Sequence, residues 1–251
     1  MKTRIFLMIF TIASFNVSIA QKNIQISTKE LMFLVDITDT IVYRQIHSDF
    51  IQSLSTFFQN TGMGKIEAEE CFTLSVAPIN ATGELQLTSA SIEILRKGMS
   101  YNDEAKLKNP RPLLNMLNAK LAEYDLLSKN NHTQSCIFEI ILKAISQTTA
   151  DETVITICSD LMEYSNIYSM YKKIPPVSEM SQIMANIDPV LLKDVKGKLK
   201  SGNAPNIVIV LKKTGANINY NELKTFWVSF FNHLGISDIK FIDNFSQNPQ
   251  I

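Results

Sequence analysis

Two short apolar segments, each running into acidic and hydroxyl side chains, constrain the fold of this chain most strongly. The first, at residues 31–35, is followed by Asp36, Thr38 and Thr40, and the second, beginning at Val154, is followed by Asp160. Such runs are typical of buried parallel strands, and open α/β sheets bind ligands at the carboxyl ends of those strands. The two segments therefore predict two halves of one oxygen-lined cation site.

The rest of the sequence alternates between strand-like and helix-like patterns. The turn at Asn80–Gly83 separates two strand-like segments and makes them hairpin-like. We predict an α/β fold with a Rossmann-like, mostly parallel central sheet, helices on both faces and one antiparallel hairpin strand. The strand-like segments are 31–38, 71–78, 85–95, 154–159, 206–211 and 239–242, and helical spacing covers 46–58, 113–127, 137–149 and 223–234.

The amino-terminal residues have the pattern of a secretory leader. Lys2 and Arg4 precede an apolar core at 5–12, and small residues at 18 and 20 form a cleavage pattern before Gln21. We expect residues 1–20 to be a signal peptide and residues 21–251 to form one domain. The mature protein is then secreted, to the periplasm in a Gram-negative bacterium, without a stable membrane span. An uncleaved anchor or an ordinary first helix is the alternative.

Charge and cysteine content argue against some classes of function. Lys plus Arg and Asp plus Glu each number 24, and no basic stripe stands out, which argues against nucleic acid as the main partner. The three cysteines, Cys71, Cys136 and Cys158, are too few and too widely spaced for a disulfide framework or a zinc site. We expect them to pack as buried thiols, with a single disulfide as the alternative.

The hydroxyl and carboxyl side chains at the strand ends form a set of hard oxygen ligands. A tight loop after the first strand can bring Asp36, Thr38 and Thr40 around one point. Asp160 supplies a second carboxylate, and Ser135, at the predicted start of a helix, supplies a third hydroxyl. Such a set suits a Mg²⁺-type ion that keeps several waters. We predict a metal site formed by these five residues.

This pattern resembles the metal-ion-dependent adhesion site of von Willebrand factor A domains, which is written Asp-x-Ser-x-Ser, then Thr, then Asp. The first part matches the motif that begins at Asp36, and the final Asp matches Asp160. The lone Thr of the family matches Ser135, with Thr133 as a nearby competitor. The chain departs from the family by having Thr at both Ser positions, Ser in place of Thr, and Leu161 where many members have Gly.

The resemblance covers about residues 28–245 and implies a function without catalysis. By resemblance, the hydroxyls of Thr38, Thr40 and Ser135 contact Mg²⁺ or Mn²⁺ directly, while the two aspartates act mainly through bound waters. An open coordination position then accepts a carboxylate from a partner protein. Glu163 is a further candidate at the rim of this site, or it starts a helix. The chain is therefore expected to be an exported protein-interaction module.

Two alternatives remain open at this point. In the first, Asp36 and Asp160 only cap helices and satisfy loop amides, and the protein is a metal-free structural scaffold of the same fold. In the second, the chain is a phosphatase of the haloacid-dehalogenase type, whose signature is Asp-x-Asp-x-Thr. That signature fits poorly, because Thr38 occupies the position of the general acid. Binding of a divalent ion would distinguish the metal-free scaffold from the interaction module and the phosphatase. Turnover of a substrate would distinguish the phosphatase from the interaction module.

Overall fold

The computed structural model describes residues 27–60, 70–92, 111–130, 132, 134–202, 204–214 and 217–247. The expected signal peptide at 1–20 and the candidate ligand Thr133 lie outside the described residues, as does the end of the predicted 85–95 strand. Among the described helices, none is both long enough and apolar enough to cross a membrane.

Six strands form one sheet in the order β3-β2-β1-β4-β5-β6. Every neighbouring pair is parallel except β2 and β3, which are antiparallel. The predicted mostly parallel sheet with one hairpin strand is therefore confirmed. The strands are β1 (Ser27–Asp36), β2 (Glu70–Ile79), β3 (Thr88–Ile92), β4 (Glu152–Ser159), β5 (Asn206–Leu211) and β6 (Ile239–Ile242).

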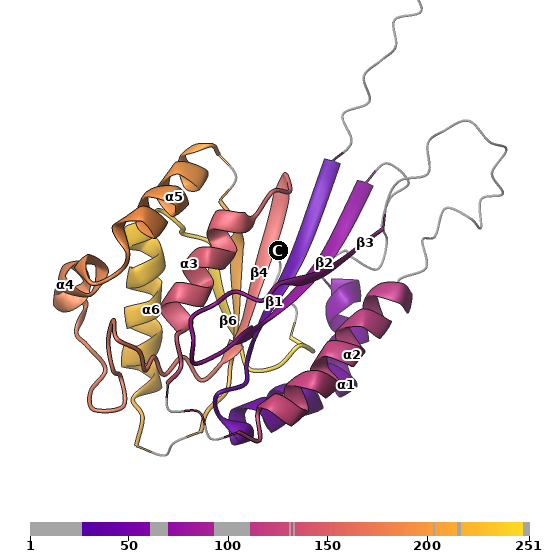
Figure 1. Ribbon diagram of the computed structural model, residues 1–251, viewed down its shortest axis with the longest axis horizontal. Coiled ribbons are helices and arrows are strands. Elements are labelled where there is room, and N and C mark those ends of the chain that lie inside the picture. Colours follow the sequence, from indigo (N-terminus) through magenta and orange to yellow (C-terminus); the bar gives the residue numbers. More distant parts are fainter. Residues whose placement is uncertain are drawn as a thin grey trace, which may run out of the picture.

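Helices cover both faces of this sheet, which confirms the predicted layering. Figure 1 shows α1 and α2 on one side of the strands and α3, α5 and α6 on the other. Side-chain caps define two of the helix starts, at Asp188 for α5 and Asn219 for α6, and Gly235 ends α6 with a φ of 92°. The helices are α1 (Thr40–Asn60), α2 (Arg111–Leu127), α3 (Ile137–Gln147), α4 (Met180–Ala185), α5 (Pro189–Lys200) and α6 (Tyr220–Leu234), with a short 3₁₀ turn at Val177–Glu179 before α4.

The continuous apolar run in β1 follows from burial on both faces. Leu31, Phe33 and Val35 belong to the core on the α1–α2 side, whereas Met32 and Leu34 belong to the core on the α3–α6 side. All five side chains are fully buried. Successive side chains of a strand point to opposite faces, so a central strand that is covered on both faces needs apolar residues at odd and even positions alike.

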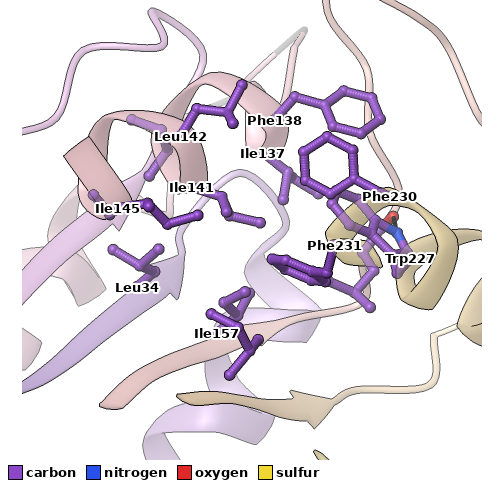
Figure 2. Close-up of a cluster of buried hydrophobic side chains, with 14 of the residues drawn as sticks. Leu34, Ile137, Phe138, Ile141, Leu142, Ile145, Ile157, Trp227, Phe230 and Phe231 are labelled. Atoms are coloured by element: carbon purple, nitrogen blue, oxygen red, sulfur yellow. Dashed lines mark hydrogen bonds between the residues drawn. The ribbon is translucent and has the colours of Figure 1, made fainter. Parts of the chain in front are cut away.

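An aromatic cluster joins α6 to α3 and to the loop after β4. Figure 2 shows side chains of α3 and α6 meeting above the sheet, around Phe138 and Trp227. The rings of these two residues lie 4.9 Å apart, and Phe230 lies 4.9 Å from Phe138. The indole Nε1 of Trp227 donates to the carbonyl of Leu161 at 3.1 Å. The aromatic face of α6 is thus part of the core, and it holds the backbone next to Asp160 in place.

The three cysteines carry free thiols. Cys136 and Cys158 are buried, as expected, and Cys158 is fully enclosed within β4. Cys71, at the start of β2, is only partly buried, because it faces outward at the amino end of the sheet where the polar Thr73 follows it on the same face.

Candidate functional site

The carboxyl ends of β1 and β4 bring Asp36 and Asp160 next to each other. Asp36 is the last residue of β1, and Asp160 directly follows β4. These strands are parallel neighbours, with Val35 opposite Cys158. The chain builds the sheet outward in opposite directions from this pair, so the strand order reverses between β1 and β4. Open α/β sheets bind ligands beside the carboxyl ends of the strands at such a reversal, and these strand ends lie toward the lower edge of the sheet in Figure 1.

The Asp36 carboxylate is held by the loop that follows it and by the end of β4. Its Oδ1 accepts from the amide of Thr38 at 3.0 Å and from the Thr38 hydroxyl at 2.6 Å. Its Oδ2 accepts from the hydroxyl of Ser159 at 2.6 Å. Ser159 in turn accepts from the amide of Leu161 at 2.9 Å, so it joins both loops. The sequence prediction missed Ser159, although its place at a strand end beside Asp160 was a usable signal.

Asp160 is held in a similar way but from different elements. Its Oδ1 accepts from the amide of Met162 at 3.0 Å, and its Oδ2 accepts from the hydroxyl of Thr214 at 3.1 Å. Thr214 follows β5 and was not predicted as a site residue. Burial, and then the charge of Asp36, raise the pKa of the Asp160 carboxyl to about 7. Burial also raises the pKa of Asp36.

No described lysine or arginine forms an ion pair with Asp36 or Asp160. Both side chains are nevertheless almost fully buried, at 1% and 4% exposure. A buried carboxylate needs a compensating charge or several hydrogen bonds to remain ionised. With no such charge among the described residues, the pair holds protons more readily than free carboxyls do, and a cation that replaced those protons would supply the missing compensation.

The three predicted hydroxyl ligands differ in how the protein uses them. Thr38 donates its proton to Asp36, and Thr40 donates its proton to the carbonyl of Ser128 at 2.6 Å. A hydroxyl that donates in this way still has lone pairs that can accept a metal ion. The Ser135 hydroxyl is buried and has no hydrogen-bond partner within the part of the chain that the structure describes. The residues present therefore fit a hydrated, oxygen-preferring divalent ion.

Thr38 and Ser135 line the same pocket, which has a volume of about 530 Å³. The loop 164–172 forms its other wall, and the backbones of Ser135 and Tyr164 are joined by two hydrogen bonds of 2.8 and 3.0 Å. The structure thus places residues from three separated parts of the chain at one opening. The lining consists of Thr38, His132, Gln134, Ser135, Tyr164, Ser169, Tyr171 and Lys172.

Two nearby carboxylates serve as helix caps. Asp39 Oδ1 accepts from the amides of Ile41 and Val42 at the start of α1, at 2.6 and 3.1 Å. Glu163, the further candidate, neither lines the pocket nor starts a helix of its own. Its Oε2 accepts from the amide of Phe138 at 2.9 Å and so caps α3 from a distant loop. Burial raises the pKa of Glu163 to about 8.

The residue after Asp160 has a backbone conformation that favours glycine. Leu161 has a φ of 63°, the left-handed region, and among the described residues it is the one residue other than glycine with a positive φ. A leucine in this region costs roughly 1–2 kcal/mol relative to glycine. The fully buried side chain of Leu161 packs in the core beside α6, and this burial offsets the backbone cost. Burial of the side chain thus accounts for a leucine in a backbone conformation that favours glycine.

The carboxylate content of the site limits which metals it suits. Within the described ranges, no group of three or more His, Cys, Asp or Glu side chains is placed to hold a metal ion. The predicted set contains two carboxylates and three hydroxyls and would leave much of the coordination to water. Such a set suits Mg²⁺ or Mn²⁺ and does not suit zinc, which prefers nitrogen and sulfur ligands.

No protein-family model and no curated protein sequence matches the chain. Among solved structures, it is similar to the human COPII-coat protein Sec24c, with 9% sequence identity and a TM-score of 0.39 over 86% of this chain and 29% of that chain. It is also similar to the pilus adhesin SpaC from Lactobacillus rhamnosus GG in its open conformation, with 10% identity and a TM-score of 0.42 over 88% and 28%. The chain spans less than a third of each protein, and these likenesses are too distant to bear on function.

Proposed function

We propose that this protein is an exported interaction module of the von Willebrand factor A type that binds a partner protein through a divalent cation. The observation that carries the proposal is the Ser135 hydroxyl, which is buried without a hydrogen-bond partner among the described residues. Ser135 lines the same pocket as Thr38, and no lysine or arginine among the described residues pairs with the carboxyls of Asp36 and Asp160. A buried polar atom without a partner is costly, and a ligand supplies what is missing.

The residues would hold Mg²⁺ or Mn²⁺ partly by direct contact and partly through bound waters. Thr38, Thr40 and Ser135 would offer hydroxyl oxygens to the ion, and Asp36 and Asp160 would act mainly through its bound waters. The hydrogen bonds from Thr38, Ser159 and Thr214 hold the two carboxylates in place. A bound ion would supply an open coordination position for a carboxylate of the partner protein. In a Gram-negative source, the location of this interaction would be the periplasm.

A metal-free scaffold is the second candidate, and a specific observation favours it. Each aspartate already accepts a hydrogen bond from a loop amide, Asp36 from Thr38 and Asp160 from Met162. These bonds stabilise the loops without any ion. They leave the buried hydroxyl of Ser135 without a hydrogen-bond partner among the described residues, so we favour the metal site.

The phosphatase alternative gains no support from the lysine at the end of β5. The ammonium group of Lys212 is buried, but it pairs with Asp49 of α1 and donates to the carbonyl of Asp243 at 2.9 Å. It is thus directed away from Asp36. Together with Thr38 at the position of the general acid, this arrangement favours binding over catalysis.

The deciding experiment is calorimetric titration of Mg²⁺ and Mn²⁺ into the protein without residues 1–20. We expect saturable binding with a Kd near or below about 1 mM, in the range of extracellular sites that contain few charges. Asp36→Ala and Asp160→Asn should each weaken binding at least tenfold. Asp188→Asn, which changes an exposed cap of α5 far from the site, should leave it unchanged. An absence of binding at several millimolar ion would favour the scaffold.

A further inference from the structure

Exposed apolar side chains gather around the proposed cation site. Six large apolar side chains are exposed in the described part of the chain, and four of them lie at the carboxyl edge of the sheet. They are Ile41, Leu126, Tyr164 and Tyr171, with exposed fractions of 61%, 67%, 44% and 60%. Exposed apolar residues that cluster in this way mark protein-interaction surfaces, whereas scattered ones do not.

These four residues flank the site from two sides. Ile41 lies in the first turn of α1, next to Thr40, and Leu126 lies in the last turn of α2. The hydroxyl of Thr40 joins these two helices by donating to Ser128. On the α3 side, the backbone of Tyr164 is hydrogen-bonded to the backbone of Ser135. The ring of Tyr164 meets the ring of Tyr171 edge to face, with 5.6 Å between the ring centroids. The pocket with Thr38 and Ser135 opens beside this tyrosine pair.

The charge of the pocket mouth indicates what it would accept. Lys172 lines the pocket, and no Asp or Glu among the described residues does so. The carboxyls of Asp36 and Asp160 act on Tyr171 at this mouth, so the mouth favours an anion only when a bound divalent cation offsets their charge. Tyrosines beside a desolvated charge are the residues that commonly dominate binding energy at protein interfaces.

We infer that the partner presents a carboxylate side chain directly next to a large apolar side chain, with the carboxylate at the cation and the apolar group on Tyr164 and Tyr171. This inference rests on the proposed cation-dependent function and adds the chemistry of the partner segment. A small free acid would leave the tyrosine pair exposed, and an acidic segment without an apolar neighbour would do the same.

The test uses three capped tripeptides, Gly-Asp-Phe, Gly-Asp-Gly and Gly-Asn-Phe, titrated into the Mg²⁺-loaded protein and followed by NMR chemical shifts. Gly-Asp-Phe should bind about tenfold more tightly than Gly-Asp-Gly, which is the effect expected of one buried aromatic side chain at a protein interface. Gly-Asn-Phe, which lacks the carboxylate, should bind at least tenfold more weakly than Gly-Asp-Phe. Chelation of the ion with EDTA should abolish the difference between the two Phe peptides.

Variants locate the apolar contact. Tyr171→Ala and Tyr164→Ala should remove the preference for Phe over Gly, while Val190→Ala, which truncates an equally exposed residue of α5, should keep it. Equal binding of the two Asp peptides, or binding of neither to a protein that takes up Mg²⁺, would overturn the inference and leave the cation site intact. Failure to bind Mg²⁺ in the calorimetric titration would instead count against the proposed function.

Discussion

The hydroxyl of Ser135 offers a direct test of the site, because folding and metal binding make opposite demands on it. Ser135 is 3% exposed, and its Oγ has no hydrogen-bond partner among the described residues. A buried hydroxyl without a partner costs about 1–3 kcal/mol, whereas the void left by one missing atom costs less than about 1 kcal/mol. Ser135→Ala should therefore raise the metal-free stability by about 1 kcal/mol, or about 2–4 °C in Tm for a domain of this size.

Metal binding should respond in the opposite direction. If wild type is measured at about 100 times its Kd for Mg²⁺, binding stabilises it by about 2.7 kcal/mol, or roughly 5–10 °C. A tenfold weaker Kd in Ser135→Ala reduces this to about 1.4 kcal/mol. The variant should therefore melt higher than wild type in EDTA but show about half of the Mg²⁺-induced shift.

Thr156→Val is the matched control for this experiment. Thr156 lies in β4, is fully buried, and also has a hydroxyl without a hydrogen-bond partner in the described ranges. Valine has nearly the same shape, so the variant should gain stability in EDTA and keep the full shift with Mg²⁺. Thermal unfolding with and without Mg²⁺ measures all of these values. A lower Tm of Ser135→Ala in EDTA, or an undiminished Mg²⁺ shift, would refute the reasoning.

Three further predictions concern the surroundings of the site. Burial raises the pKa of Glu163 from an ordinary value near 4.5 to about 8, so its folded state holds a proton that the unfolded state loses, and stability should fall as pH rises across this range. Glu163→Gln can still accept a hydrogen bond from the Phe138 amide. Its free energy of unfolding, measured with urea, should therefore fall less between pH 5 and pH 9 than that of wild type. Gly83→Ala and Gly202→Ala should each destabilise by about 1 kcal/mol, because their φ values of +68° and +95° strain any residue with a Cβ, while the new Cβ at 83 would meet only the flexible end of Glu139 and the one at 202 open space. Leu161→Gly should lower stability by about 1–3 kcal/mol in the same assay, since the lost burial exceeds the relieved backbone cost.

Much of the architecture could be predicted because each element buries a face that its own residues define. The segments 206–211 and 239–242 were predicted with the limits that β5 and β6 have. The helical spacing of apolar residues predicted over 223–234 ends at Leu234, the last residue of α6. These signals are local, since they depend on side-chain periodicity and on the conformational preferences of single residues.

The contacts within the candidate site were less accessible to prediction. The sequence placed Asp36 and Asp160 at strand ends, but it could not show that Ser159 bonds to Asp36 or that Thr214 bonds to Asp160. It also left the role of Glu163 open between a site rim and a helix start, whereas the structure shows a cap on α3. Such contacts depend on the register between strands and on the course of loops, which residue patterns do not specify.

Residue patterns alone were enough to predict an α/β sheet with acidic and hydroxyl side chains after two central strands, because burial on both faces requires continuous apolar runs. The three-dimensional structure was needed to show that those two strands are neighbours, that Thr38 and Ser135 line one pocket, and that the exposed rings of Tyr164 and Tyr171 lie at it. These relations join residues that are far apart along the chain. Apolar periodicity acts within a segment, while the pairing of β1 with β4 joins residues 123 positions apart through the packing of the whole domain.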